Sequence, residues 1–182
     1  MHVDQVGATL EKIDRKFIQE ASQWIIESIF KGGNALYLCG NGGSHAIVSH
    51  FATDLHKTAL SGNFTPRIFA LGTNLSLITA LSNDFSFEEV FSREVKNLGR
   101  KGDTLFSVSS SGVSPNIIAA MKMARNIGMV NITLNGFADS DSVSLAEFSL
   151  DLKLVDKKYE LAEDIHSIVC HSIAMEIKKL VS

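Results

Sequence analysis

Ala35-Leu-Tyr-Leu-Cys39-Gly-Asn-Gly-Gly-Ser44 is the stretch that decides the fold of this 182-residue chain. Its first five residues form a short continuous apolar run, which is typical of a strand buried on both faces. The glycines that follow permit a tight turn, and the residues from about Ser44 to Leu60 predict a helix after it. A strand, a glycine-rich turn and a helix in this order are the start of a parallel α/β unit.

Further segments on both sides of this stretch repeat the alternation. Apolar residues at near-helical spacing predict an amphipathic opening helix from about Gly7 to Phe30. The other expected strands are Pro66–Leu71, Thr104–Val108, Met129–Leu134 and, as an edge strand, Phe148–Leu154. The other expected helices are Thr73–Ser82, Phe87–Asn97, Pro115–Ile127 and Glu160–Val181. This order predicts a parallel sheet covered by helices on both faces, whose ligands bind beyond the carboxyl ends of the strands.

The composition is that of a single mildly acidic domain. Hydrophobic residues make up 45% of the chain, and a net charge of −3 leaves no basic field for nucleic acid. Cys39 and Cys170 both lie in apolar runs, which is typical of buried thiols in a reducing compartment. No apolar stretch reaches the roughly 20 residues that span a bilayer, and no apolar signal core opens the chain. We therefore expect one domain over residues 1–182 in a cytoplasmic protein without a membrane segment.

Two turns after expected strands carry groups that could bind an anion. In Cys39–Ser44 the glycines bring backbone N–H groups and a helix N-terminus close to a ligand. This turn matches neither the dinucleotide fingerprint nor the nucleotide P-loop, and a tight turn capped by Ser44 explains it equally well. The second turn, Val108–Ser114, offers a phosphate four hydroxyls, those of Ser109, Ser110, Ser111 and Ser114. A helix cap uses only one of these hydroxyls, so phosphate binding is the favoured interpretation.

Two expected helices carry candidate metal ligands or acid–base groups. His50 and Asp54 lie four residues apart on one helical face, where they could be metal ligands, an acid–base pair or a simple hydrogen bond. Glu163 and His171 lie along one slowly turning stripe of the last helix. The middle of that helix carries no charged side chain, so we expect both of its sides to be covered, by a subunit interface or a pocket wall. For His166, between them, a structural role is expected.

Five blocks of sequence together resemble the phosphoheptose isomerase family, which has the sugar isomerase (SIS) fold. In order they are CGNGGS at 39–44, HFATDL at 50–55, SNDFSFEEVFSREV at 82–95, GDTLFSVSSSGVSPN at 102–116 and AEDIHSIVCHSI at 162–173. The resemblance implies a flavodoxin-like αβα sandwich with a five-stranded parallel sheet, preceded by an N-terminal helix in residues 1–33. It also implies a homotetramer that packs through this helix.

The implied activity is an aldose–ketose isomerisation of a phosphosugar. The family converts sedoheptulose 7-phosphate to glycero-manno-heptose 7-phosphate on the way to lipopolysaccharide or capsular heptose. By resemblance, the substrate-binding residues are Asn41, Gly42, Gly43, Ser44, Asn83, Asp84, Ser109, Ser110, Ser111, Ser114 and Glu163. The implied ligands of a divalent metal, expected to be zinc, are His50, Asp54, Glu163 and His171. The resemblance further assigns Asp54 as the catalytic base and His171 as its acid–base partner.

Two departures from the family pattern fall within this set. Asp54 stands where the family usually has Glu, and Glu163 stands where it has Gln. Because Asp is one methylene shorter, either the backbone must bring its carboxylate about 1.5 Å closer or the substrate must shift. A site with two acids and two histidines is more anionic than the family's and suits a zinc-like ion.

Two other functions stay open on the sequence alone. One is a phosphosugar-binding adaptor without catalysis, like the SIS-domain relatives that associate with the bacterial replication initiator. Those relatives lack the paired acids and histidines, so the presence of His50, Asp54, Glu163 and His171 favours an enzyme. The other is an isomerase of a different phosphosugar, because pocket shape decides which sugar is accepted.

Overall fold

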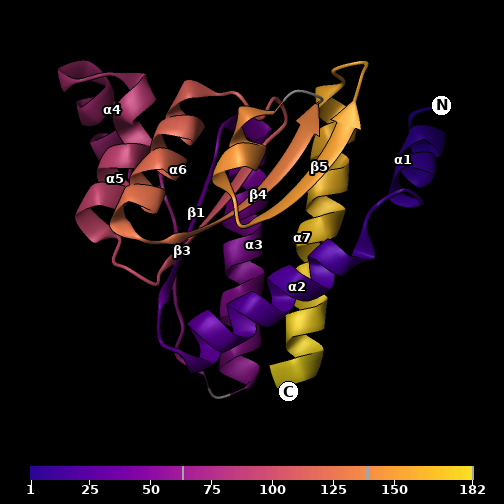
Figure 1. Ribbon diagram of the computed structural model, residues 1–182, viewed down its shortest axis with the longest axis horizontal. Coiled ribbons are helices and arrows are strands. Elements are labelled where there is room, and N and C mark those ends of the chain that lie inside the picture. The colour runs from indigo at the N-terminus through magenta and orange to yellow at the C-terminus, as the bar shows by residue number, and fades with distance from the viewer. Residues whose placement is uncertain (63, 138–139, 182) are drawn as a thin grey trace.

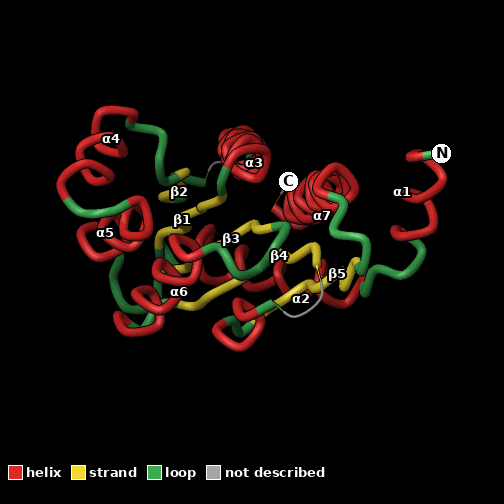
Figure 2. The backbone as a smooth tube through the Cα atoms, turned by 90° about the horizontal axis from the view of Figure 1, so that it is seen from above, coloured by secondary structure: helices red, strands yellow, loops and turns green. Residues whose placement is uncertain are grey.

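The centre of the molecule is a parallel sheet of five strands, and the computed structural model describes residues 1–62, 64–137 and 140–181. The strands are β1 (Ala35–Gly40), β2 (Arg67–Ala70), β3 (Thr104–Ser109), β4 (Val130–Phe137) and β5 (Phe148–Leu154). Their order is β2-β1-β3-β4-β5, and every neighbouring pair is parallel. Figures 1 and 2 show helices on both sides of this sheet. The predicted αβα sandwich is confirmed, with Phe148–Leu154 at the edge.

Helices lie close to the bounds that the sequence predicts. They are α3 (Gly42–Ser61), α4 (Leu75–Asp84), α5 (Val90–Leu98), α6 (Pro115–Ile127) and α7 (Tyr159–Val181). Figure 2 shows α3 and α7 over one face of the sheet and α5 and α6 over the other. The bounds of α6 follow from its ends, because Pro115 fits a first helical turn and Gly128 ends the helix with a φ of 88°.

The side chains of strand β1 alternate between the two layers of the core. Leu36 and Leu38 point into the cluster formed with α2 (Arg15–Ile25), α3 and α7. Tyr37 and Cys39 point to the opposite face, into the cluster with α5 and α6. All six residues of β1 are buried. The continuous apolar run therefore reflects a strand covered on both faces.

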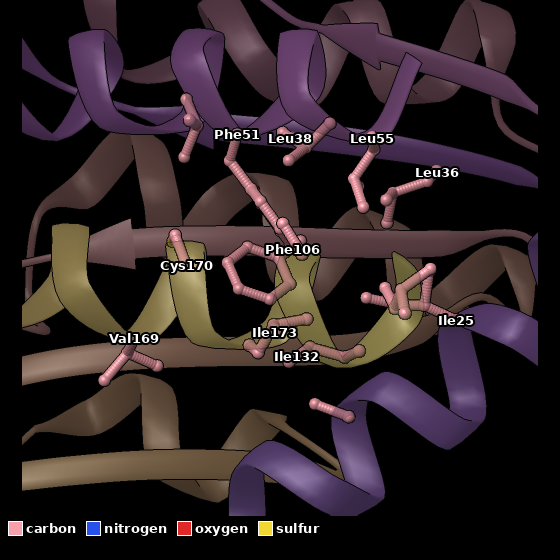
Figure 3. Packing of buried hydrophobic residues seen from close by; sticks show 14 of the residues in the cluster. Ile25, Leu36, Leu38, Phe51, Leu55, Phe106, Ile132, Val169, Cys170 and Ile173 are labelled. Atoms are coloured by element: carbon pink, nitrogen blue, oxygen red, sulfur yellow. The ribbon is translucent and has the colours of Figure 1, made fainter. Parts of the chain in front are cut away.

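The larger cluster joins α3 to α7 above the middle of the sheet. Phe51 of α3 packs on Phe106 of β3 with ring centroids 5.2 Å apart, and Ile173 of α7 lies beside them (Figure 3). Cys170 belongs to the same cluster, and both cysteines of the chain are buried free thiols. Burial raises the pKa of Cys39 to about 12 and also raises the pKa of Cys170.

The predicted opening helix is wrong in its bounds, because three helical pieces replace it. They are α1 (His2–Leu10), α2 and the π-helical turn η1 (Ile26–Lys31). Asp14 starts α2 in an extended conformation, and its side chain accepts a hydrogen bond from the Lys16 N–H at 2.9 Å. An N-cap of this kind begins a new helix and so breaks the run. Helix α1 lies apart from the sheet, beside the first half of α7, and buries none of its residues (Figure 1).

Smaller differences concern the segments around β4 and α5. Strand β4 continues to Phe137, three residues beyond the predicted end at Leu134. The 3-10 turn η2 (Phe87–Glu89) lies within the predicted helix Phe87–Asn97, and no element is predicted at the 3-10 turn η3 (Asp141–Leu145), since turns this short leave too few residues to show a repeat. Within the described ranges, no helix is long and apolar enough to cross a membrane.

His166 of α7 is fully buried, in agreement with the structural role expected for it. Neither ring nitrogen has a hydrogen-bond partner among the described residues. Burial lowers the pKa of His166 to about 4, against a smaller opposing effect of the Asn135 backbone. The neutral imidazole is therefore the form that the folded chain holds.

The His166 site makes stability depend on pH. Because the pKa of His166 is about 4 in the fold and 6.5 in a model peptide, the unfolded chain binds the proton first as pH falls. The contribution of neutral His166 to the free energy of unfolding is complete above pH 6.5 and is lost as pH falls toward 4. Between pH 7 and pH 5 the free energy of unfolding should drop by about 2 kcal/mol from this residue. Urea unfolding of wild type and His166→Leu at both pH values measures it, and an equal drop in both proteins contradicts the account.

Candidate active site

A small cavity, called the serine cavity below, opens at the carboxyl edge of the sheet, between β1 and β3. Its volume is about 100 Å³, and its lining residues are Asn41, Ser44, Val108, Ser109, Ser110, Ser111, Ser114, Tyr159 and Glu163. The chain order of the strands reverses between β1 and β3, the position at which open parallel sheets bind ligands. The structure therefore brings the glycine turn and the serine loop together, as the sequence predicts. Tyr159 is a lining residue that the sequence motifs did not indicate.

The glycine turn lies against α7 at the cavity. Gly42 has a φ of 51°, a left-handed conformation that glycine adopts without strain. A Cβ atom on Gly43 would overlap the carboxylate of Glu163, so the end of this side chain packs directly over the glycine. Asn41 exchanges two hydrogen bonds with Asn116 of α6, at 2.9 and 2.8 Å. The first turns of α3 and α6 are thereby held side by side at the cavity.

The serine loop presents its hydroxyls around the start of α6. Ser109 Oγ accepts the Gly112 N–H at 3.1 Å, and the hydroxyls of Ser111 and Ser114 lie 3.2 Å apart. Ser114 precedes α6, but its side chain makes no capping bond. Ser110 Oγ is buried with no hydrogen-bond partner among the described residues. A loop with unused hydroxyls beside a helix N-terminus can donate several hydrogen bonds to a phosphate.

A second group of polar side chains lies farther along α3 and α7. His50 and Asp54 of α3 meet His171 of α7, and one ligand atom of each lies within 4.8 Å of the others. Asp54 Oδ2 is 3.3 Å from Nε2 of His50 and 3.7 Å from Nε2 of His171. The two imidazole rings are nearly perpendicular, with centroids 5.1 Å apart. The shorter carboxylate of Asp54 thus reaches both imidazoles.

This His50–Asp54–His171 group has the chemistry of a divalent metal site. Two imidazole nitrogens and one carboxylate oxygen are a common ligand set for catalytic zinc, which keeps a fourth position open. The side chains of His50 and His171 are 63% and 49% exposed, so a ligand can approach from solvent. A groove of about 440 Å³ adjoins the group, lined by Asp54, Lys57, Thr58, Leu60, Ser61, His171, Ala174, Met175 and Lys178. The two lysines of this groove were not singled out by the sequence motifs.

Glu163 lies in the serine cavity rather than with the His50–Asp54–His171 group. It precedes His171 by eight residues in α7, which is about 12 Å along the helix axis. Its carboxylate packs over Gly43 and lines the cavity. One copy of the chain therefore gives Glu163 a place at the substrate cavity, and its metal-binding role stays a prediction.

Asn83 and Asp84 lie away from the cavity at the end of α4. They are exposed, and Asn83 Nδ2 donates a hydrogen bond to Asp84 Oδ1 at 2.9 Å. Neither residue lines the serine cavity, and Figure 2 shows α4 on the opposite side of α3 from α7. Their contact with a substrate stays a prediction.

Comparison with known proteins gives concordant matches over most of the chain. The family described as SIS domain matches residues 2–136. The chain is similar to the phosphoheptose isomerase of Roseiflexus sp. (strain RS-1), with 32% identity over 97% of this chain and 91% of the relative. It is 38% identical to the phosphoheptose isomerase of Crocosphaera subtropica over 85% of this chain and 78% of the relative.

Solved structures of the same kind share the fold. The phosphoheptose isomerase from Neisseria gonorrhoeae superposes with a TM-score of 0.86 at 29% identity, covering 98% of this chain and 93% of that one. The phosphoheptose isomerase from Francisella tularensis has a TM-score of 0.84 at 23% identity, with 98% and 92% covered. The second likeness supports the fold alone.

The His50–Asp54–His171 group should bind one Zn²⁺ per chain. Replacing His50 or His171 by Ala removes a direct ligand and should weaken binding by at least about 100-fold, since even residues that only orient ligands are worth 10- to 100-fold. His56→Ala is the matched control, because His56 Nε2 bonds the Ile68 carbonyl at 3.1 Å outside the group. Competition with a chromophoric chelator measures the affinities. Equal affinity of wild type and His171→Ala would rule out this ligand set.

Proposed function

The chain belongs to the phosphoheptose isomerase family of SIS-domain proteins, and on that premise we propose that it converts sedoheptulose 7-phosphate to glycero-manno-heptose 7-phosphate. The observation that carries the proposal is the convergence of His50, Asp54 and His171 from two helices far apart in the sequence. An acid–base pair at this place is what an aldose–ketose isomerisation requires.

The chemistry transfers one proton between neighbouring carbons. Asp54 removes a proton from C1 of the ketose, an enediol forms, and the same carboxyl group returns the proton to C2. Both contacts of Asp54 with the imidazoles use Oδ2, which leaves Oδ1 to accept the proton. His171 moves the hydroxyl proton from O1 to O2, so that the ketone becomes an alcohol and the alcohol an aldehyde.

Phosphate binding in this proposal depends on hydroxyls and backbone N–H groups. Of the residues that the structure describes, no Lys or Arg lines the serine cavity, and the one acidic lining residue among them is Glu163. The N-terminus of α6 offers its positive dipole end and free N–H groups, and the hydroxyls of Ser109, Ser110, Ser111 and Ser114 surround it. A phosphate held in this way has no direct counter-charge.

A divalent metal, expected to be zinc, would be held by His50, Asp54 and His171. When bound, such an ion stabilises the negative charge that develops on the two substrate oxygens. The donor atoms fit, because two nitrogens and an oxygen from side chains lie within 4.8 Å of one another.

We further propose a homotetramer in which neighbouring copies complete the site. From Gly43 to Asp54, α3 rises by about 16 Å. Within one copy, the serine cavity and the acid–base pair are therefore separated by this length of helix. A second copy can bring its own cavity residues, with Asn83 and Asp84, to the His50–Asp54–His171 group. Ile168 and Met175 of the uncharged stretch of α7 are 37% and 62% exposed in the single chain, and α1 has no fully buried residue, which leaves apolar surface for such packing.

The heptose product would supply lipopolysaccharide or capsule synthesis. An adaptor without catalysis would not need three ligand groups from two helices at one point, so their convergence favours the enzyme. Turnover of sedoheptulose 7-phosphate compared with five- and six-carbon ketose phosphates decides between this sugar and another phosphosugar.

Asp54→Asn removes the proposed base while keeping nearly the same shape. The kcat for sedoheptulose 7-phosphate should fall by about 100-fold or more, the usual contribution of a positioned base. Glu176→Gln, which neutralises another acid near the surface of α7, should leave kcat within about twofold. A coupled assay for the aldose measures both, and wild-type turnover by Asp54→Asn would reject the assignment.

Replacing Ser111 and Ser114 together by Ala tests the phosphate site. Because each lost hydroxyl removes a hydrogen bond to a charged group, the KM should rise by at least about tenfold. Ser144→Ala is the control, since that hydroxyl bonds the Asp141 carbonyl at 2.8 Å on an exposed turn. If the double variant keeps the wild-type KM, the loop serves as a turn and not as a phosphate site.

A further inference from the structure

Two side chains hold opposite sides of one peptide group after β2. The Leu71 carbonyl accepts a hydrogen bond from His45 Nε2 at 3.0 Å. The N–H of the same peptide, that of Gly72, donates to Glu94 Oε1 at 2.9 Å. His45 comes from the first turn of α3 and Glu94 from α5. The peptide that leads from β2 toward α4 is thus fixed from two elements.

The surroundings of Gly72 leave this peptide little freedom. Gly72 has a φ of 78°, and a Cβ there would come within 3.0 Å of Phe91 Cε1 and 3.4 Å of His45 Nε2. Glu94 is 9% exposed, and burial raises its pKa, opposed by the Gly72 N–H and by His45. A buried carboxylate with a backbone partner is costly to leave unpaired, so the bond to Gly72 is strongly specified.

The same helix α5 also anchors the far end of α4. The Arg93 guanidinium lies 3.3 Å from the ring centroid of Phe85, the residue that follows Asp84. Arg93 is held in turn by Glu89 at 2.7 Å. Helix α4 has no fully buried residue, and two of its partly buried side chains pack it against the core, so contacts at its ends add to this anchoring. Arg93 and Glu94, which are consecutive residues of α5, therefore contact residues that flank the two ends of α4.

We propose that Glu94 and His45 are positioning residues, which hold α4 so that Asn83 and Asp84 are presented to the substrate. This inference rests on the proposed function, in which a second copy brings those two substrate-binding residues to the His50–Asp54–His171 group. We call the hydrogen bonds of His45 and Glu94 to the Leu71–Gly72 peptide the clamp. Because His45 follows Ser44 of the cavity, the clamp connects the segment before α4 to the glycine turn. Neither Glu94 nor His45 touches the substrate in this account.

The clamp needs an acceptor oxygen at position 94 and does not need its charge. Glu94→Gln keeps an oxygen for the Gly72 N–H, whereas Glu94→Ala leaves that N–H without its partner. For sedoheptulose 7-phosphate, kcat/KM should fall by about tenfold or more in Glu94→Ala, since misplacement by about 1 Å can cost about 100-fold. Glu94→Gln should stay within about threefold of wild type.

A double-variant cycle separates positioning from general loss of stability. Asn83→Ala should lower kcat/KM in the wild-type background but have little further effect in Glu94→Ala, because the clamp acts through α4. Glu147→Ala is the matched control, as it removes a carboxylate bond to the Asn131 N–H at 2.7 Å far from the cavity, and it should keep the wild-type kcat/KM. Additive effects of Asn83→Ala and Glu94→Ala would overturn the proposal.

Hydrogen exchange measured by mass spectrometry gives a second readout that needs no substrate. In Glu94→Ala, amides of residues 75–84 should exchange faster, while those of residues 115–127 in α6 should not change. His45→Ala releases the carbonyl side of the same peptide and should give the same pattern if Glu94→Ala does not fold. Unchanged exchange in residues 75–84, or faster exchange with wild-type kcat/KM, would overturn the proposal alone. A wild-type protein without phosphosugar turnover would overturn the proposed function and the positioning role with it.

Discussion

The close packing of α3 against α7 is the constraint on which the rest of the structure depends. At its upper end the carboxylate of Glu163 packs directly over Gly43. Midway, Phe51 and Ile173 fill the space between the two helices and the sheet (Figure 3). On the outer side of the same contact, Asp54 meets the two imidazoles. One helix pair thus places the cavity wall, the core and the candidate acid–base group.

Much of the fold could be predicted because its signals are local. The apolar run at 35–39 and the Pro115 and Gly128 ends of α6 needed only periodicity and turn chemistry. The break at Asp14 was missed, although Asp is a good N-cap residue, since apolar spacing alone continued across it. The place of Asn83 could not be predicted in the same way, because α4 has no fully buried residue and contacts with α5 help to fix its end.

Part of the candidate site could also be predicted from the sequence, and part of it could not. Turns that follow neighbouring parallel strands must meet at one edge, so the serine loop and the glycine turn could be placed together from the sequence. Glu163 and His171 share a helical stripe, yet eight residues of helix separate them by about 12 Å, and a shared stripe does not imply a shared site within one copy. Among the described residues no Lys or Arg lines the cavity, so the proposed phosphate site depends on helix dipoles and hydroxyls, and the proposed tetramer adds residues of further copies.

The central claim is that this chain interconverts a ketose and an aldose phosphate. The most direct measurement is a carbon NMR time course of sedoheptulose 7-phosphate labelled with ¹³C at C1, incubated with the zinc-loaded protein. The account predicts that the C1 hydroxymethyl signal declines while the anomeric C1 signal of the aldose grows to an equilibrium ratio. A folded, zinc-loaded protein that leaves the C1 hydroxymethyl signal unchanged would contradict it.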